Sequence, residues 1–232
     1  MSSRPPDRFA HRRGEPRTFA ALWVVYLLLI TMTTIGAVGL LGWMSPEVYR
    51  ASARVMISAT GVAIGIVWPL VRLSQEWPTR ISRACLADVA IVIVSTQAVV
   101  WPQTAPWLAA WPTDVGAVIA SSLAAWAFLI GGVLWIAMRV NTRVPRALWM
   151  ILILAIVIGM PGVAASLGER AWLMYSPITG VFDAGSERPI SGQTAWVGPE
   201  HWQGVVWVGA LGVIVWLVGG WVGGGRDAAR LD

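Results

Sequence analysis

Lysine is absent from this 232-residue chain, cysteine occurs once, histidine occurs twice, and only 12% of the residues are charged. About a quarter of the residues are charged in a typical soluble domain, so the composition argues against a soluble fold. The single cysteine, Cys85, excludes an intrachain disulfide and cysteine-rich metal sites, and we interpret it as a packing residue. Both histidines, His11 and His201, lie outside the apolar runs, so haem ligation at membrane depth is not expected.

Motifs of catalysis are missing as well. The chain contains no HExxH, no GxSxG, no Walker phosphate loop and no paired carboxylates. We therefore expect no catalytic residue, no cofactor site and no metal site, and we do not interpret the protein as an enzyme.

Long apolar runs dominate what is present, since 56% of the residues are hydrophobic and the mean hydropathy is +0.65. The sequence predicts an all-α, polytopic membrane protein with one membrane domain, residues 19–222. The first run is longer than the apolar core of a signal peptide, so we expect it to be retained. The expected spans are about residues 19–42, 55–71, 84–101, 115–138, 147–167 and 203–222.

The connectors between these runs are short, with one exception. We expect a tight turn over residues 43–50, polar connectors over 72–83 and 139–146, an interfacial connector over 102–114, and a long outer loop over 168–202. Pro69 should distort the last turn of the second span, and Asp114 should cap the fourth. Pro199 falls where the first turn of the sixth span is expected.

Because the chain has no lysine, its 17 basic side chains other than histidine are all arginines. These arginines are unevenly distributed along the sequence. With the N-terminus inside, 13 of the 17 arginines fall on the inner side, in the basic segment 1–18, the connectors 72–83 and 139–146, and the tail 223–232. Arg50, Arg54, Arg170 and Arg188 fall on the outer side. The positive-inside rule then predicts that both termini are cytoplasmic, in a bacterial-type inner (cytoplasmic) membrane. Because the arginines mark topology, we expect a lipid bilayer as a partner and no nucleic acid.

Two polar residues fall within the third span. Asp88 lies about one turn from its inner end, and Gln97 lies further along. A functional interpretation places them on a transport path. We favour a structural interpretation, in which Asp88 pairs with Arg72 or Arg83 near the surface and Gln97 joins two helices. On that interpretation, Asp88→Asn should leave folding largely intact.

Glycine pairs at a spacing of four occur in the second span, at Gly61 and Gly65, and in the sixth, at Gly219 and Gly223. This spacing allows two helices to approach closely. Since the chain contains 24 glycines, we interpret each pair as internal packing, in preference to a dimer face.

The strongest functional lead is the stretch WLMYSPITGVFDAG, residues 172–185. An aromatic-rich turn leads into Ser176-Pro177-Ile178-Thr179, and a short apolar stretch then reaches Asp183. This stretch resembles the proline-containing turn that follows the fifth helix in permeases of the type 2, six-helix class of ABC transporters. Six spans, a basic segment before the first span and a long outer segment before the last one are also similar to that family.

The resemblance implies a partner ATPase and a second permease subunit. It also implies that the connector between the second and third spans contacts the ATPase. The implied contact residues are Arg72, Glu76, Trp77, Arg80 and Arg83. The same arginines also fit a second interpretation, in which they only mark the inner face and Trp77 is an interfacial anchor.

Two functional hypotheses follow. In the first, the chain is the permease subunit of an ABC-type exporter, driven by a separate ATPase through alternating access. In the second, it is a non-transporting structural or anchoring subunit of a larger membrane complex, and its outer loop is a docking surface. A neighbouring gene that encodes an ATPase with a GxxxxGK[ST] motif would favour the first hypothesis.

The arginine asymmetry generates a topology prediction. A reporter that is active only outside the cytoplasm should give signal when it is fused after Ala105 or Gln193. The same reporter at the C-terminus should be silent. Signal from the C-terminal fusion would contradict the proposed orientation.

Overall fold

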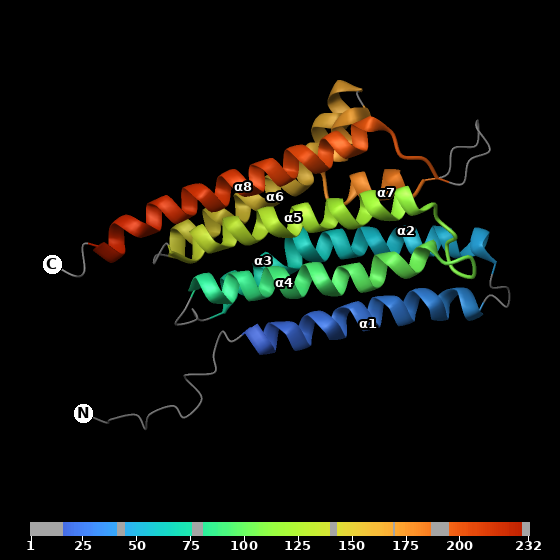
Figure 1. Ribbon diagram of the computed structural model, residues 1–232, viewed down its shortest axis with the longest axis horizontal. Helices are drawn as coiled ribbons and strands as arrows, with labels where there is room; N and C mark the ends of the chain where they lie inside the picture. Colours follow the sequence, from blue (N-terminus) through green and yellow to red (C-terminus); the bar gives the residue numbers. More distant parts are fainter. Residues whose placement is uncertain are drawn as a thin grey trace.

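The structure is a computed structural model that describes residues 16–40, 45–75, 81–139, 143–168, 170–186 and 195–228 (Figure 1). This part of the chain is helical and contains no strand. Six of its helices are long and apolar enough to cross a membrane, which confirms the predicted all-α, multi-pass fold. These candidate spans are Thr18–Gly39, Pro46–Ser74, Ile81–Thr104, Thr113–Arg139, Arg146–Leu167 and Pro199–Trp221.

The spans correspond to longer and shorter helical elements. The long helices are α1 (Pro16–Leu40), α2 (Pro46–Val62), α4 (Ile81–Val100), α5 (Thr113–Arg139), α6 (Arg143–Leu167) and α8 (Pro199–Ala228). Short elements are the π-helical turn η2 (Ala63–Val67), α3 (Trp68–Ser74), the 3-10 turns η3 (Trp101–Thr104) and η4 (Arg170–Tyr175), and α7 (Thr179–Ala184). The start of α1 and the end of α8 lie at the same end of the bundle (Figure 1). We call that end the inner end and the opposite one the outer end.

Helix α5 is the centre of the bundle and packs between α4 and α8 (Figure 1). In its most apolar stretch 72% of the residues are buried, against 12% in α6. Two adjacent glycines make this packing possible, because a Cβ on Gly131 would meet Val89 of α4 and a Cβ on Gly132 would meet Trp216 of α8. Leucine, valine and isoleucine side chains cover the exposed faces of α1, α6 and α8, as expected for helices that face lipid.

The second span begins earlier than its composition predicts, so the tight turn expected over residues 43–50 is wrong. Helix α2 already starts at Pro46. The hydroxyl of Ser45 accepts a hydrogen bond from the Val48 N–H at 3.4 Å, Pro46 occupies the first turn, and Glu47 lies beside the positive helix end. Arg50 lies within the helix and its Nε donates to the carbonyl of Ala109 at 2.8 Å.

A π-helical turn interrupts this second span directly before Pro69. Within η2, the Trp68 N–H donates to the carbonyl of Ala63, which is a wider turn than in an α-helix. Pro69 has no N–H to donate, which favours an irregular turn on its N-terminal side. The distortion expected at this proline is therefore present, and it lies before the proline.

A buried ion pair joins α3 to α4 near the inner end. The Nε and Nη2 of Arg72 donate to the two carboxylate oxygens of Asp88, with 2.5 Å between Nη2 and Oδ1. Both side chains are 1% exposed. The Arg72 guanidinium also lies over the Phe19 ring of α1, 5.3 Å from its centroid. The predicted pairing of Asp88 with Arg72 is confirmed, but the pair is buried inside the bundle, whereas we expected it near the surface.

This burial reverses the expectation for Asp88→Asn. Without the carboxylate, Arg72 would lose the charged partner of its Nε and Nη2 inside the bundle, and breaking a buried ion pair costs about 3–5 kcal/mol. We predict that Asp88→Asn lowers the unfolding temperature in mild detergent. The double change Arg72→Leu with Asp88→Leu should recover most of the loss, because it removes both charges.

The matched control for this prediction is Asp114→Asn, since Asp114 is an exposed acid in the first turn of α5. It should change the unfolding temperature little. If Asp88→Asn is as stable as this control, then Arg72 does not depend on the ion pair.

Candidate functional site in the outer segment

The stretch singled out from the sequence, residues 172–185, turns back into the bundle. We call it the outer segment; it comprises most of η4, the turn at residues 176–178, and α7. Helix α7 packs against α2 and α5, whereas η4 packs against α6 and α8. Figure 1 shows α7 beside α5 and α2 near the outer end of the bundle. Irregular backbone at membrane depth needs such burial in protein, because lipid offers it no hydrogen bonds.

Side-chain hydrogen bonds hold the turn of the outer segment in place. The Ser176 hydroxyl donates to the carbonyl of Val157 in α6 at 3.2 Å and accepts from the Ile178 N–H at 3.3 Å. The Thr179 hydroxyl donates to the carbonyl of Leu173 at 2.8 Å. Ser176 is completely buried. Two of the residues that carry the family resemblance therefore close the turn and attach it to the fifth span.

The turn reaches the middle of the second span. A Cβ on Gly61 would lie 2.1 Å from the carbonyl oxygen of Pro177, so only glycine permits this contact. A Cβ on Gly65 would meet Val157 and the ring of Pro177. The interpretation of the Gly61–Gly65 pair as internal packing is confirmed, and its partner is the proline turn of the outer segment.

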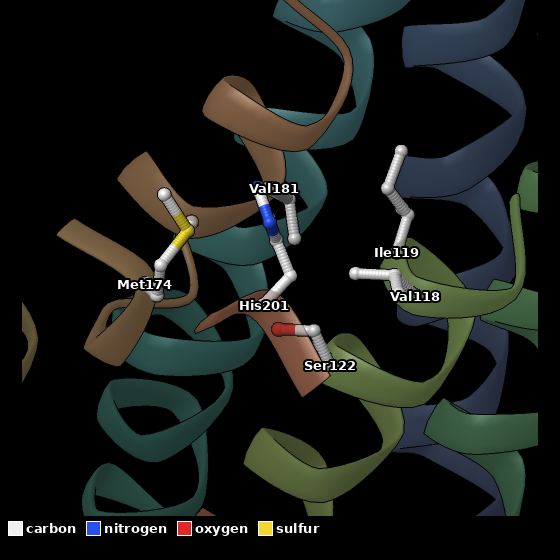
Figure 2. Close-up of a pocket in the computed structure, with 7 residues that line it drawn as sticks. Val118, Ile119, Ser122, Met174, Val181 and His201 are labelled. Carbon is white, nitrogen blue, oxygen red and sulfur yellow. The ribbon is translucent and has the colours of Figure 1, made fainter. Parts of the chain in front are cut away.

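His201 joins the outer segment to the start of α8. Its Nδ1 accepts a hydrogen bond from the Gly198 N–H at 3.1 Å, so in the neutral ring the proton is on Nε2. Nε2 lies 3.4 Å from Oδ2 of Asp183 in α7. Figure 2 shows His201 between the outer segment, with Met174 and Val181, and α5, with Val118 and Ser122. The cavity at this junction has a volume of about 10 Å³, room for no more than one water.

Ser122 and His201 line this cavity and Asp183 lies beside His201, but the three side chains do not form a hydrolytic triad. A triad needs one ring nitrogen for the acid and the other for the serine. Here Nδ1 is taken by the Gly198 N–H and Nε2 faces Asp183, so no ring nitrogen is available to Ser122. Among the described residues, no group of three acidic, histidine or cysteine side chains is placed to hold a metal ion.

His201 was not recognised as a site residue from the sequence. The sequence placed it in the outer loop, just before the expected sixth span, yet it lies in the first turn of α8 and is only 3% exposed. The available signal was the Gly198-Pro199 pair, because a proline in the first turn marks the start of α8 at Pro199 and so places His201 inside the helix.

The polar residue Gln97 has the structural role that we favoured. Its side-chain nitrogen donates to the carbonyl of Ala120 in α5 at 3.2 Å, and its oxygen accepts from the Trp101 indole N–H at 3.0 Å. Gln97 therefore joins α4 to α5, as interhelical polar residues commonly do.

The residues implied as ATPase contacts fall into three groups. Arg72 lies inside the bundle, where Asp88 occupies its guanidinium, so it is not available on the inner surface. Arg83 is exposed in the first turn of α4. Glu76, Trp77 and Arg80 lie outside the described residues.

Comparisons with protein families, with curated proteins and with solved structures find no match to this chain. The fold and the site define a class, namely an integral membrane protein of six helical spans whose outer segment folds back into the bundle. The function is therefore inferred from geometry.

The contact between Gly61 and Pro177 generates the prediction for this site. Gly61→Ala should destabilise the protein by about 1–3 kcal/mol, because the added methyl group must displace backbone of the outer segment. Gly36→Ala on α1 is the control, since nothing lies within 4 Å of its Cβ position. The control should be neutral or slightly stabilising, because alanine favours helix more than glycine does. Equal unfolding temperatures for the two variants in detergent would refute this contact.

Proposed function

We propose that the chain is the permease subunit of an ABC-type exporter. The observation that carries this proposal is the outer segment, which leaves the fifth span, re-enters the bundle as far as Gly61, and returns to the outer end before the sixth span. Such a segment obstructs the outer half of the bundle while leaving the inner half to the long helices. A segment in this position suits a transporter whose transport path stays closed at the outer end until an ATPase acts on the inner end.

The buried ion pair suits the same role at the inner end. The connector between the second and third spans begins after Ser74 and ends before Ile81. Arg72 and Asp88 tie the two helices together on either side of that connector. A force applied there by an ATPase would move α3 and α4 as one body, since separating them requires breaking a buried charge pair.

One continuous span links this inner end to the outer segment. Arg72 follows the π-helical turn η2, whereas Gly61, which contacts Pro177, precedes it. Helical interruptions of this type are frequent at functional sites. Displacement of α3 would therefore reach the outer segment through α2, with η2 as the position where the span bends or changes register.

In this proposal the transport path forms between this chain and a second permease copy. The exposed apolar face of α6 is available for that pairing, since little of this helix is buried within one chain. ATP hydrolysis belongs to the separate subunit, and this chain performs no covalent chemistry. Both termini face the cytoplasm, on the side where the ATPase would bind.

The connector tests the exporter proposal. We predict that Glu76→Ala with Arg80→Ala leaves membrane insertion unchanged but removes a co-purifying ATPase or uncouples its ATP hydrolysis. Arg83→Ala, at an exposed position beside the connector, should give a weaker effect of the same kind. Arg143→Ala, at the start of α6 beside the other inner connector, is the control and should retain the ATPase.

The decisive measurement is co-purification of the wild-type chain from its own membranes in mild detergent. An associated protein that binds and hydrolyses ATP supports the proposal. If no nucleotide-binding protein accompanies the wild-type chain, the proposal fails and the anchoring subunit becomes the working hypothesis.

A further inference from the structure

A second cavity lies between α1 and α4, apart from the outer segment. Its volume is about 340 Å³, within the range of small-molecule binding pockets, about 300–1,000 Å³. Its walls are largely apolar and include Leu27 and Leu28 of α1 and Ala98 and Val99 of α4. Leu28 is 54% exposed, so the cavity opens sideways toward lipid.

The two ends of this cavity differ in polarity. Near the middle of the spans, the Trp23 indole N–H donates to the Ser95 hydroxyl at 2.8 Å, so the polar groups at that end are satisfied. At the outer end the cavity meets Tyr49 of α2 and Gln103 of η3. Both side chains are 3% exposed, and neither the Tyr49 hydroxyl nor the Gln103 carbonyl oxygen has a hydrogen-bond partner.

These two oxygens destabilise the protein as long as they have no hydrogen-bond partner. A buried polar atom without a partner raises the free energy of the folded state, and the cost is greater where water is scarce. The side chains of Tyr49 and Gln103 lie close enough to interact. Their geometry, however, leaves both the Tyr49 hydroxyl and the Gln103 Oε1 without a hydrogen bond. A ligand that offers both a donor and an acceptor at this level would satisfy them.

The cavity is polar at the outer end and apolar toward the middle of the spans, and this arrangement identifies the class of ligand. The polar end of the cavity lies at the end of the bundle, where η3 and the start of α2 meet, and the apolar part extends toward the middle of the spans. A phospholipid in the leaflet at the outer end has the same arrangement, with its headgroup at the interface and its acyl chain pointing inward. A soluble ligand would have no route to the side opening except through lipid.

We propose that this cavity binds one acyl chain of a phospholipid from the leaflet at the outer end, and that Tyr49 and Gln103 hold the polar end of that lipid. The Tyr49 hydroxyl donates to an ester carbonyl of the lipid, and the Gln103 carbonyl accepts from a headgroup donor. This inference does not depend on a partner ATPase, so it stands or falls separately from the exporter proposal.

Selectivity for this lipid comes from its polar end. An acyl chain is already out of water in the bilayer, so the apolar walls contribute little hydrophobic driving force. A hydrogen bond to a buried group discriminates more strongly, typically by about two- to tenfold in binding. The site should therefore prefer phosphatidylethanolamine or phosphatidylglycerol, whose headgroups carry donors, over phosphatidylcholine, whose headgroup carries none.

The test uses the full chain in vesicles of phosphatidylethanolamine and phosphatidylglycerol that contain phosphatidylethanolamine with a photoreactive group in one acyl chain. Illumination should label peptides covering residues 24–35 and 95–103 more strongly than other lipid-facing peptides. Ala98→Trp should abolish this labelling by filling the cavity. Val94→Trp is the matched control, because Val94 is 69% exposed on the same helix and does not line the cavity.

Tyr49→Phe and Gln103→Met test the polar end without filling the cavity. Each should reduce labelling about two- to tenfold. Only Gln103→Met should also weaken the preference over a phosphatidylcholine probe, because only the Gln103 side chain accepts from the headgroup donor. Even labelling of all lipid-facing helices, or labelling that survives Ala98→Trp, would overturn the proposal. So would a chain that self-associates through α1 and α4, with Ala98→Trp dispersing the oligomer and no lipid label at these peptides.

Discussion

Water is scarce in the hydrocarbon core of a bilayer, so each polar group at that depth depends on a partner within the protein. Arg72 and Asp88 meet this requirement with each other, and Gln97 meets it with the backbone of α5. The irregular turn of the outer segment meets it through Ser176 and Thr179. The Tyr49 hydroxyl and the Gln103 Oε1 have no such partner within the protein, and for this reason we propose that a lipid binds them. One constraint thus accounts for the fold, the site and the proposed ligand.

The number and approximate positions of the spans follow from the sequence, because hydropathy averaged over a span is insensitive to which residues face each other. The start of the second span could not be read in the same way. Arg50 and Arg54 resemble the end of a helix in a hydropathy profile, yet they lie inside α2, and the Arg50 Nε bonds to the Ala109 carbonyl. That partner belongs to a connector more distant in the chain, which only the tertiary structure brings close.

The candidate site was predictable in part. Ser176 and Pro177 marked a turn because serine followed by proline favours one, and the Gly61–Gly65 spacing marked a close approach. Neither pattern reveals that the two features face each other across the bundle. The roles of His201 and Arg72 were missed or misassigned for a related reason. A charged or titratable residue near a predicted span end looks interfacial, whereas packing against α7 buries His201 and packing against Phe19 and α4 buries Arg72.

The contact between the second span and the outer segment also has a consequence for biosynthesis. The surface of α2 around Gly61 is made roughly a hundred residues before the turn that covers it, a delay on the order of 10 s at translation rates of about 5–20 residues per second. During that interval the surface of the second span at Gly61 and Gly65, which the outer segment later covers, faces lipid, the insertion machinery or a transient helix partner. The bundle therefore acquires its final packing late, when the fifth span has entered the membrane and the chain folds back toward a helix inserted long before.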